Sequence, residues 1–382
     1  MPSPASYLGI DVDQNAIKVV ELKNENGRPR LVTYGYYDRL VDEVAADGRN
    51  ADAGLGALIR TVCQQARTTT TKAISALPSF SVFSSILNLP MMPKKEMSAA
   101  VEWEAKKVIP LPIDEMILDW KILTEAAGTS DVAEASSESP PANNGTPAAN
   151  QEPPERKGLR RITQAKGKGR YVKILLTAAP KDLVKRYIGT FKEGGLNLLS
   201  LDTESFALIR SLVGHDRSGL MVVDIGSVVT NVLIIVNGVP LLNRSIDVGG
   251  LTITKAIADS LNVSLSRAEQ FKYDIGMNQN QAGQGSIPKT IEVALTPIVD
   301  ELKYSLSLYR NQGTRNIEKV ILTGGSSLLL NLPVYLSQLL DLKVYRGDAW
   351  ARVIYPEELK PVLDEIGPRF AVAVGLAMRN IL

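Results

Sequence analysis

Leu8-Gly9-Ile10-Asp11-Val12-Asp13 closely matches a later stretch, Met221-Val222-Val223-Asp224-Ile225-Gly226-Ser227. The first stretch is followed by Ala16-Ile17-Lys18-Val19-Val20-Glu21-Leu22, and the second by Val229-Thr230-Asn231-Val232-Leu233-Ile234-Ile235. Each stretch predicts a β-hairpin, because a β-branched strand ends on a carboxylate, a small or polar turn follows and a second β-branched strand returns. The N–H groups of such a turn, beside an acid that holds a hydrated cation, suit a metal-bound phosphate. One Asp before a tight turn is usually only turn chemistry. Two copies, with Asp224 213 residues after Asp11, predict two similar halves that clamp one polyphosphate between them.

The two hairpins supply the first set of predicted binding residues. Asp11 and Asp224 are predicted to hold Mg²⁺ through water, and Asp11 is also a candidate catalytic carboxylate. The other predicted contacts on the two turns and return strands are Asp13, Gln14, Asn15, Lys18, Gly226, Ser227, Thr230 and Asn231.

A third element narrows the predicted ligand. Lys319-Val320-Ile321-Leu322-Thr323 predicts a buried strand, and it ends in Gly324-Gly325-Ser326-Ser327. Paired glycines let the backbone approach a flat ring closely, where a Cβ would collide with it. Such a turn is common by itself, but after two phosphate hairpins it predicts an adenosine contact at residues 324–327. ATP with Mg²⁺ is therefore the predicted ligand.

The order of these elements resembles a known fold. A hairpin, a long insertion, a second hairpin, a Gly-Gly turn and a terminal apolar helix resemble the actin-like ATPase fold of actin, Hsp70, sugar kinases and the cell-division protein FtsA. The sequence is more similar to the PilM family, the cytoplasmic actin-like proteins of type IV pilus assembly. The motifs that carry this resemblance are Gly9-Ile10-Asp11, Lys18-Val19-Val20-Glu21-Leu22, Val108-Ile109-Pro110-Leu111-Pro112-Ile113-Asp114-Glu115, Leu201-Asp202-Thr203-Glu204-Ser205-Phe206-Ala207-Leu208, Arg244 through Gly249-Gly250, and Thr323-Gly324-Gly325-Ser326.

The resemblance implies an α/β fold with two ribonuclease-H-like lobes around a nucleotide cleft. It also implies an inserted subdomain of the FtsA and PilM type, called 1C, which serves as a partner-binding module. The implied division is a first lobe (subdomain 1A) of residues 1–77, 202–217 and 356–382, an inserted subdomain of residues 78–201, and a second lobe of residues 218–355 (subdomain 2A, with 2B at about 251–315). Within the inserted subdomain, composition predicts a disordered linker at about 126–169, where typical members of the family have a much shorter connection.

Residues outside the turns also receive predicted roles. Gly249 and Gly250 offer backbone access to phosphate oxygens. The resemblance implies that Glu204 orients the attacking water, and the alternative is a carboxylate that the dipole of a helix N-terminus favours. It also implies that Lys18 contacts phosphate, and the alternative is a surface lysine on an edge strand.

Glu269 and Lys272 lie three residues apart, on one face of a predicted helix. Such a pair is usually a surface ion pair worth a few tenths of a kcal/mol. In the actin-like fold the matching helix contacts the ribose and base of the nucleotide, so the resemblance makes both residues candidate nucleotide contacts.

Two positions depart from the family pattern. Asp13 stands where the family usually has glycine, and it brings a negative charge close to the phosphate oxygens. Val228-Val229 stands where relatives carry smaller or hydroxylated residues, which removes a side-chain donor. We expect the first change to weaken ATP binding or to require a second cation. Together they predict at most slow ATP hydrolysis.

The composition predicts a globular protein without zinc or disulfide chemistry. The chain has 382 residues, of which 45% are hydrophobic, and a net charge of +2, which gives no general attraction to nucleic acid. Cys63 is the single cysteine and His215 the single histidine, so a multi-His or cysteine metal site is excluded. No apolar run approaches the roughly 18 residues that span a bilayer. Membrane association is therefore expected only through a partner.

The segment near 126–169 is rich in Ala, Ser, Pro, Gly, Asn and Glu, and it predicts a flexible loop. Its second half carries seven basic residues, namely Arg156, Lys157, Arg160, Arg161, Lys166, Lys168 and, just beyond, Arg170. A solvated charge run is the ordinary meaning of this pattern, and a contact with anionic lipid or nucleic acid is the alternative.

The predicted function is an ATP-binding adaptor on the cytoplasmic face of a type IV pilus machine, peripheral at the inner membrane. By resemblance, it captures the N-terminal cytoplasmic tail of a PilN-like inner-membrane protein and couples nucleotide state to pilus biogenesis. Other pilus platform components, assembly ATPases and a second copy of the chain are further predicted partners, whereas nucleic acid is not. The alternatives are a filament-forming cytoskeletal protein of the FtsA and MreB type and a phosphotransferase.

Overall fold

Two five-stranded sheets with the same topology make up most of the chain in the computed structural model, which describes residues 5–39, 54–123, 171–278, 286–311 and 316–382. The first sheet has the strand order β3 (Arg28–Asp38), β2 (Ala16–Glu25), β1 (Ser6–Val12), β4 (Lys72–Leu77), β8 (Asn197–Thr203). The second has the order β11 (Val239–Ile246), β10 (Thr230–Val236), β9 (Leu220–Ile225), β12 (Lys319–Thr323), β13 (Lys343–Arg346). In both sheets an antiparallel trio is extended by two parallel strands. The two similar halves and both hairpins are thus confirmed.

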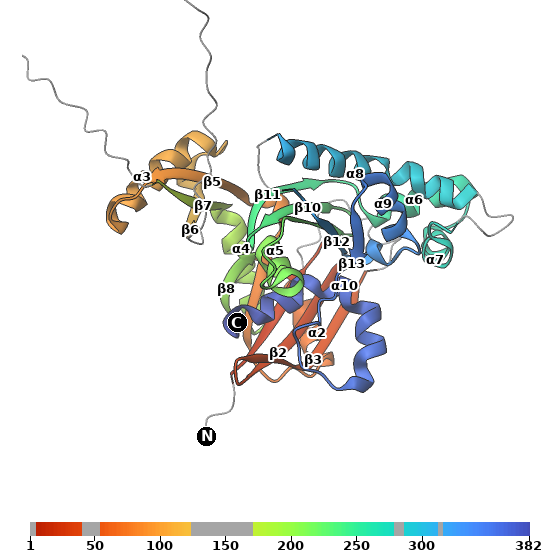
Figure 1. Cartoon of the computed structure of the whole chain (residues 1–382). Helices are drawn as coiled ribbons and strands as arrows, with labels where there is room; N and C mark the ends of the chain where they lie inside the picture. The colour runs from red at the N-terminus through yellow and green to blue at the C-terminus, as the bar shows by residue number, and fades with distance from the viewer. Residues whose placement is uncertain (1–4, 40–53, 124–170, 279–285, 312–315) are drawn as a thin grey trace, which may run out of the picture.

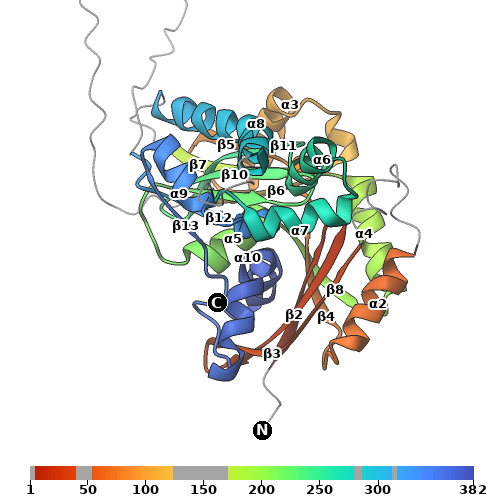
Figure 2. The ribbon, with the colours of Figure 1, turned by 90° about the vertical axis from the view of Figure 1, so that its right-hand side faces the viewer.

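Helices cover the outer face of each sheet (Figures 1 and 2). The first sheet is covered by α2 (Leu55–Gln65) and α4 (Lys181–Glu193), and the second by α6 (Gly250–Leu261), α7 (Leu265–Ile275), α8 (Ser286–Arg310) and α9 (Leu332–Leu340). Alternation along each strand sorts the side chains between two cores. In β9, for example, Met221 and Val223 pack under the outer helices, whereas Leu220 and Val222 join the inner core.

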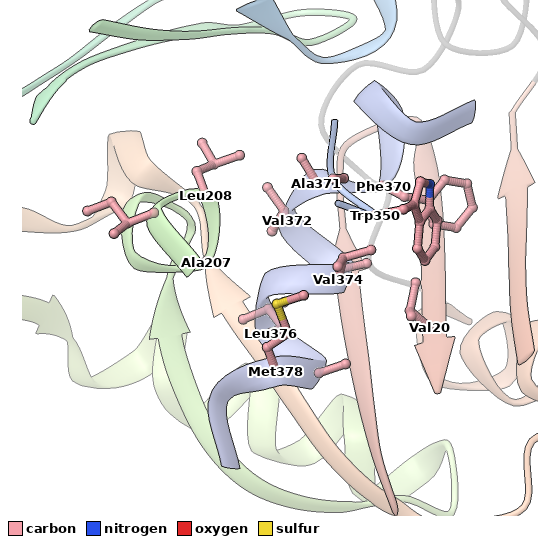
Figure 3. Packing of buried hydrophobic residues seen from close by; sticks show 14 of the residues in the cluster. Val20, Ala207, Leu208, Trp350, Phe370, Ala371, Val372, Val374, Leu376 and Met378 are labelled. Carbon is pink, nitrogen blue, oxygen red and sulfur yellow. The ribbon is translucent and has the colours of Figure 1, made fainter. Parts of the chain in front are cut away.

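Two connecting helices fill the space between the inner faces of the sheets (Figure 3). They are α5 (Glu204–Leu208), which continues into a π-helical turn η3 (Ile209–Val213), and α10 (Lys360–Ala377). Their core includes Val20 of the first sheet and Leu233 of the second. A Cβ at Gly375 of α10 would overlap the carbonyl of Ala207 in α5, so glycine lets the two helices touch. The predicted terminal apolar helix is present as α10.

A separate three-stranded antiparallel sheet projects to one side of the two lobes (Figure 1). It has the order β5 (Phe83–Pro90), β7 (Tyr171–Pro180), β6 (Met116–Leu123), and it packs against α3 (Lys94–Val108). Its small core contains Leu87, Met97, Val101 and Ile174. We call residues 79–123 and 171–180 the inserted unit.

The inserted unit ends earlier than the predicted range 78–201. β8 pairs with β4 in the first sheet, and α4 packs against α2 with Phe191 fully buried in the first-lobe core. Residues 181–201 therefore belong to the first lobe, because their strand lies in its sheet and their helix packs into its core. The chain was predicted to return to the first lobe at residue 356, but Trp350 is already buried in the core between the two sheets. The predicted loop at 126–169 lies outside the described residues, and none of the helices within them is both long and apolar enough to cross a bilayer.

The crossing of α5 and α10 makes a testable packing prediction. Replacing Gly375 by Ala forces α10 away from Ala207, and we expect the free energy of unfolding to fall by about 1–3 kcal/mol, as for other overpacked cores. Chemical denaturation followed by circular dichroism measures this change. The control is Gly189→Ala on α4, where the new Cβ meets nothing within 4 Å and should raise stability by about 0.5–1 kcal/mol. Equal effects of the two substitutions would contradict the close approach.

Candidate functional site

The strand register aligns the two hairpins residue by residue. Asp11 on β1 lies opposite Lys18 on β2, and Asp224 on β9 lies opposite Asn231 on β10. The same offset of 213 residues separates Asp11 from Asp224 and Lys18 from Asn231. Each lobe therefore presents one carboxylate and one cross-strand polar partner at the matching place.

The turns are equivalent as well. The N–H of Asp13 donates to the carbonyl of Ala16 at 2.9 Å, and the N–H of Gly226 donates to the carbonyl of Val229 at 3.0 Å. Asp13 in the first turn and Gly226 in the second thus occupy the same structural position. The two turns also touch, because the Ser227 hydroxyl donates to the side-chain carbonyl of Asn15.

A single cavity of about 1370 Å³ lies between the lobes and brings most of the predicted residues together. Its wall includes Asp11, Asp13, Gln14, Asn15, Lys18, Glu204, Asp224, Gly226, Ser227, Asn231, Gly250, Glu269, Lys272, Gly324, Gly325 and Ser326. These residues come from both hairpins, α5, α6, α7 and the turn after β12. Segments of both lobes that are distant in the sequence thus line one cavity.

Three predicted contacts lie behind this wall. The Thr230 hydroxyl is fully buried and donates to the carbonyl of Val248 at 2.7 Å. Ser327 closes its own turn by donating to the carbonyl of Gly324 at 2.7 Å. A Cβ at Gly249 would lie 2.7 Å from the carbonyl oxygen of Gly226, so glycine lets the start of α6 reach the second hairpin. In this structure these residues support the wall.

Lys18 is a buried ammonium, not a surface lysine. Its Nζ lies 2.8 Å from Oδ2 of Asp11 and 3.9 Å from Oδ2 of Asp13, and its side chain is 11% exposed. β2 lies inside the sheet between β3 and β1, so the alternative of an edge strand was wrong. Burial opposes the charged form, but the carboxylates of Asp11 and Asp13 hold the pKa of Lys18 above its ordinary value. The cavity therefore contains a fixed positive charge.

Two acids near Lys18, Asp224 and Asp13, have raised pKa values. Burial, and to a lesser degree the carboxylates of Asp11 and Asp13, raises the pKa of Asp224 to about 7, although Lys18 acts in the opposite direction. Burial likewise raises the pKa of Asp13. In the described part of the chain no group of three or more His, Cys, Asp or Glu is placed to hold a metal ion directly. Two single carboxylates that face one cavity fit a hydrated cation better than a stripped one.

Glu204 joins three parts of the molecule. It is the first residue of α5, and its Oε2 accepts the backbone N–H of Ser79 at 3.0 Å and the side-chain N–H of Asn231 at 3.2 Å. Burial, followed by the carboxylates of Asp11 and Asp224, raises its pKa to about 8. A role limited to the helix dipole does not account for these contacts with the inserted unit and the second lobe. Ser79, which the sequence analysis missed, has no motif that reveals it.

Lys272 is buried against the second lobe. Its side chain is 2% exposed, and its Nζ lies 2.6 Å from Glu269, 2.9 Å from the hydroxyl of Thr254 and 3.3 Å from the carbonyl of Gly250. Burial lowers the pKa of Lys272, and Glu269 opposes that shift. The alternative of a surface ion pair was wrong for the lysine. The pair fastens α7 to the beginning of α6, where both helices border the cavity.

The opposite rim of the cavity contains residues that sequence reasoning missed. Arg369 on α10 pairs with Asp38 at the end of β3, and its guanidinium lies 5.3 Å from the centre of the Tyr36 ring. Tyr273, from α7 of the second lobe, lines the same cavity. Asp38 and Arg369 are 331 residues apart and belong to no motif, so no sequence signal could have joined them.

Comparisons with known proteins agree with this arrangement. The family model described as type IV pilus assembly protein PilM matches residues 9–136 and 159–381. A solved structure described as a PilM-PilN type IV pilus biogenesis complex is 27% identical, covers 98% of both chains and has a TM-score of 0.76. The ethanolamine utilization protein EutJ of Carboxydothermus hydrogenoformans, 14% identical over 99% of this chain and 90% of its own with a TM-score of 0.51, shares the fold.

A curated relative is more distant. The cell division protein FtsA of Neisseria meningitidis serogroup B is 26% identical over 180 residues, which are 41% of this chain and 42% of that protein. The shared topology of the two sheets, the cavity between them and the match of the family model along nearly the whole chain lead to one assignment. The chain belongs to the family of type IV pilus assembly proteins PilM, and it has the actin-like ATPase fold.

Proposed function

We propose that this protein is a nucleotide-dependent adaptor of the type IV pilus machine. It binds ATP with Mg²⁺ between its lobes and captures the N-terminal cytoplasmic tail of a PilN-like inner-membrane protein. The observation that carries the nucleotide part is the meeting of Lys18, Asp11 and Asp224 in one cavity. The family match favours the adaptor over the filament and phosphotransferase alternatives.

The cavity offers a place for each part of the nucleotide. Lys18 and the turn N–H groups face the phosphates, and Asp11 and Asp224 hold the waters of Mg²⁺. Gly324 has φ +81°, and a Cβ there would lie 2.5 Å from Asp224 Oδ1, so only glycine suits the turn beside the nucleoside. Glu269 and Lys272 flank the ribose and base. Bound Mg²⁺ would neutralise phosphate charge in a site already rich in carboxyl groups.

Hydrolysis is expected to be slow at most. A water-orienting base needs a free carboxylate, but the pKa of Glu204 is about 8, so this group is mostly protonated at neutral pH. Its acceptor oxygen is also bonded to Ser79 and Asn231. The geometry favours a nucleotide that holds the lobes together over one that is turned over rapidly.

The junction between the inserted unit and the lobes is the proposed peptide site. The PilM of the similar solved complex assembles with PilN. Here a small cavity of about 40 Å³ is lined by Ser85 and Ile86 of β5, by Ser205 and Phe206 of α5 and by Asn243 of β11. The Ser205 hydroxyl and the side-chain carbonyl of Asn243 are buried without a hydrogen-bond partner in the described part of the chain. β5 and β8 are edge strands nearby, so an extended peptide can add backbone hydrogen bonds.

A route from nucleotide to partner passes through Glu204. Its carboxyl group bonds Asn231, next to Asp224 across the strands, and Ser79, the first residue of the inserted unit. The turn η1 (Ser79–Ser81) also packs against β11 of the second lobe. A change in lobe closure therefore moves the base of the inserted unit. Capture of a membrane-bound tail would place the protein at the cytoplasmic face of the inner membrane, and other platform components would join through that assembly.

Nucleotide binding is tested by Asp224→Asn. Loss of the carboxylate removes one anchor of the hydrated Mg²⁺, and we expect the affinity for Mg·ATP to fall by about tenfold or more, which corresponds to about 1.4 kcal/mol. Isothermal titration calorimetry measures it. The control is Asp182→Asn, whose side chain is 97% exposed on α4 and which should bind as the wild type does. Identical affinities for all three proteins would remove the role of Asp224.

The proton on Glu204 makes stability depend on pH. Because the folded state raises this pKa from 4.5 to about 8, the contribution of Glu204 to stability is greatest below pH 4.5 and is lost as the pH rises toward 8. We expect the free energy of unfolding of the wild type, minus that of Glu204→Gln, to decrease across this window. Urea denaturation at several pH values measures the difference, and exposed Glu358→Gln should show none of it. A flat difference for Glu204→Gln would show that the carboxyl group is not buried with its proton.

The peptide site is tested by Ser85→Trp. The indole fills the junction lined by α5 and β11, and we expect capture of a synthetic PilN-like N-terminal peptide to fall by about tenfold or more. Fluorescence anisotropy of the labelled peptide gives the dissociation constant. Ser307→Trp on the exposed side of α8 is the matched control. If the two tryptophan variants bind the peptide equally well, the junction is not the site.

A further inference from the structure

Asp13 breaks the symmetry between the two phosphate turns. Its counterpart at the same turn position in the second hairpin is Gly226, and the two turns are closed by the same backbone hydrogen bond. Glycine has no side chain and leaves the turn open to an anion. Asp13 adds a carboxylate to a turn that is otherwise built in the same way.

The Asp13 carboxylate already uses the groups that would bind a phosphate. Its Oδ1 accepts the backbone N–H of Gln14 at 2.7 Å, the next donor along the turn. Its Oδ2 lies 3.9 Å from the ammonium of Lys18. The first hairpin thus presents its donors to its own side chain.

The same carboxylate extends into the gap between the lobes. A Cβ built on Gly226 would lie 4.0 Å from Asp13 Oδ2, so this oxygen faces the second turn directly. The Asn15–Ser227 hydrogen bond holds the two turns in contact beside it. The Asp13 side chain is 36% exposed, so solvent reaches part of it. It fills the gap and can still turn away at a cost.

In the binding mode proposed above, the terminal phosphate of the nucleotide enters this gap. The proposed nucleoside contacts, Gly324 and Lys272, belong to the second lobe, whereas Lys18 lies on the first. A phosphate chain that runs from the former to the latter places its last phosphate between the turns. A diphosphate ends earlier and leaves Asp13 where it is.

We propose that Asp13 is a specificity-determining residue of this site: it weakens the binding of a terminal phosphate, so that nucleoside diphosphates bind at least as tightly as triphosphates. The inference rests on the nucleotide binding proposed above and assigns its preferred ligand class. Asp13 competes with a terminal phosphate for the Gln14 N–H and the Lys18 ammonium, and it repels that phosphate when both are charged. A diphosphate meets neither penalty.

Calorimetric titration with ADP and ATP, each with Mg²⁺ in excess, tests this assignment. The wild type should bind ADP at least as tightly as ATP. Asp13→Gly, which reproduces Gly226, should raise the affinity for ATP by about tenfold relative to that for ADP. Asp13→Asn keeps the shape without the charge, and it should give a smaller change in the same direction.

A matched control comes from the inserted unit. Asp119 on β6 is exposed, and its Oδ1 accepts the N–H of the next residue, Trp120, at 3.0 Å, as Asp13 does for Gln14. Asp119→Gly and Asp119→Asn should leave both nucleotide affinities unchanged. If Asp13→Gly does not fold, the sign of the ATP-to-ADP change in Asp13→Asn decides.

The outcomes separate this inference from the proposed function. If both nucleotides bind and the Asp13 variants change the two affinities equally or not at all, Asp13 does not set the preference, although the site stands. If neither nucleotide binds the wild type or any variant, nucleotide binding itself fails and the assignment of Asp13 fails with it.

Discussion

The buried Lys18 ammonium shares one cavity with the carboxyl groups of Asp11, Asp13, Asp224 and Glu204, and this group of charges is the constraint on which the site depends. Charges taken out of water are costly unless they are paired. Asp11 pairs with Lys18 at 2.8 Å, whereas Asp13 lies 3.9 Å from the same ammonium and Glu204 accepts hydrogen bonds from Ser79 and Asn231. Burial raises the pKa of Asp224 to about 7 and that of Glu204 to about 8, so the fold favours the protonated forms of these two groups. A divalent cation would replace those protons, so metal, nucleotide and proton binding are linked.

The two connecting helices, α5 and α10, join the cavity to both lobes because they lie between the two sheets. Gly375 lets α10 touch α5, and the carbonyl of Pro368 on α10 accepts hydrogen bonds from Thr323 and Gly324, at the end of β12 and the start of the turn after it. Glu204 begins α5 and reaches both the second lobe and the inserted unit. These contacts tie both lobes and the inserted unit to the two connecting helices. Hinge closure about a few terminal residues is the usual way in which such folds respond to ligands.

The sequence was sufficient where local chemistry decides the structure. The two β-branched hairpins and the Gly-Gly turn were predictable because strand propensity and glycine freedom act within a few residues. The pairing of Asp11 with Lys18 was not, because the register depends on the length of the turn between them. Nor does the spacing of Glu269 and Lys272 reveal that Lys272 is buried, since periodicity gives a helix face but not what covers it. The sequence pattern of residues 181–201 predicts a helix and a strand but fits the insertion and the first lobe equally well. Only the pairing of β8 with β4 assigns them to the first lobe.

The two hairpins share one backbone plan and differ in what their side chains do with it. At the cross-strand position the first has Lys18 and the second Asn231, and at the turn the first has Asp13 and the second Gly226. The first hairpin thus concentrates charge, while the second offers a bare backbone and a neutral amide that binds Glu204. Two identical hairpins would place either two ammonium groups or two open turns in one cavity. The charge therefore lies on the first hairpin, whereas the second hairpin is tied through Asn231 to Glu204 at the start of α5.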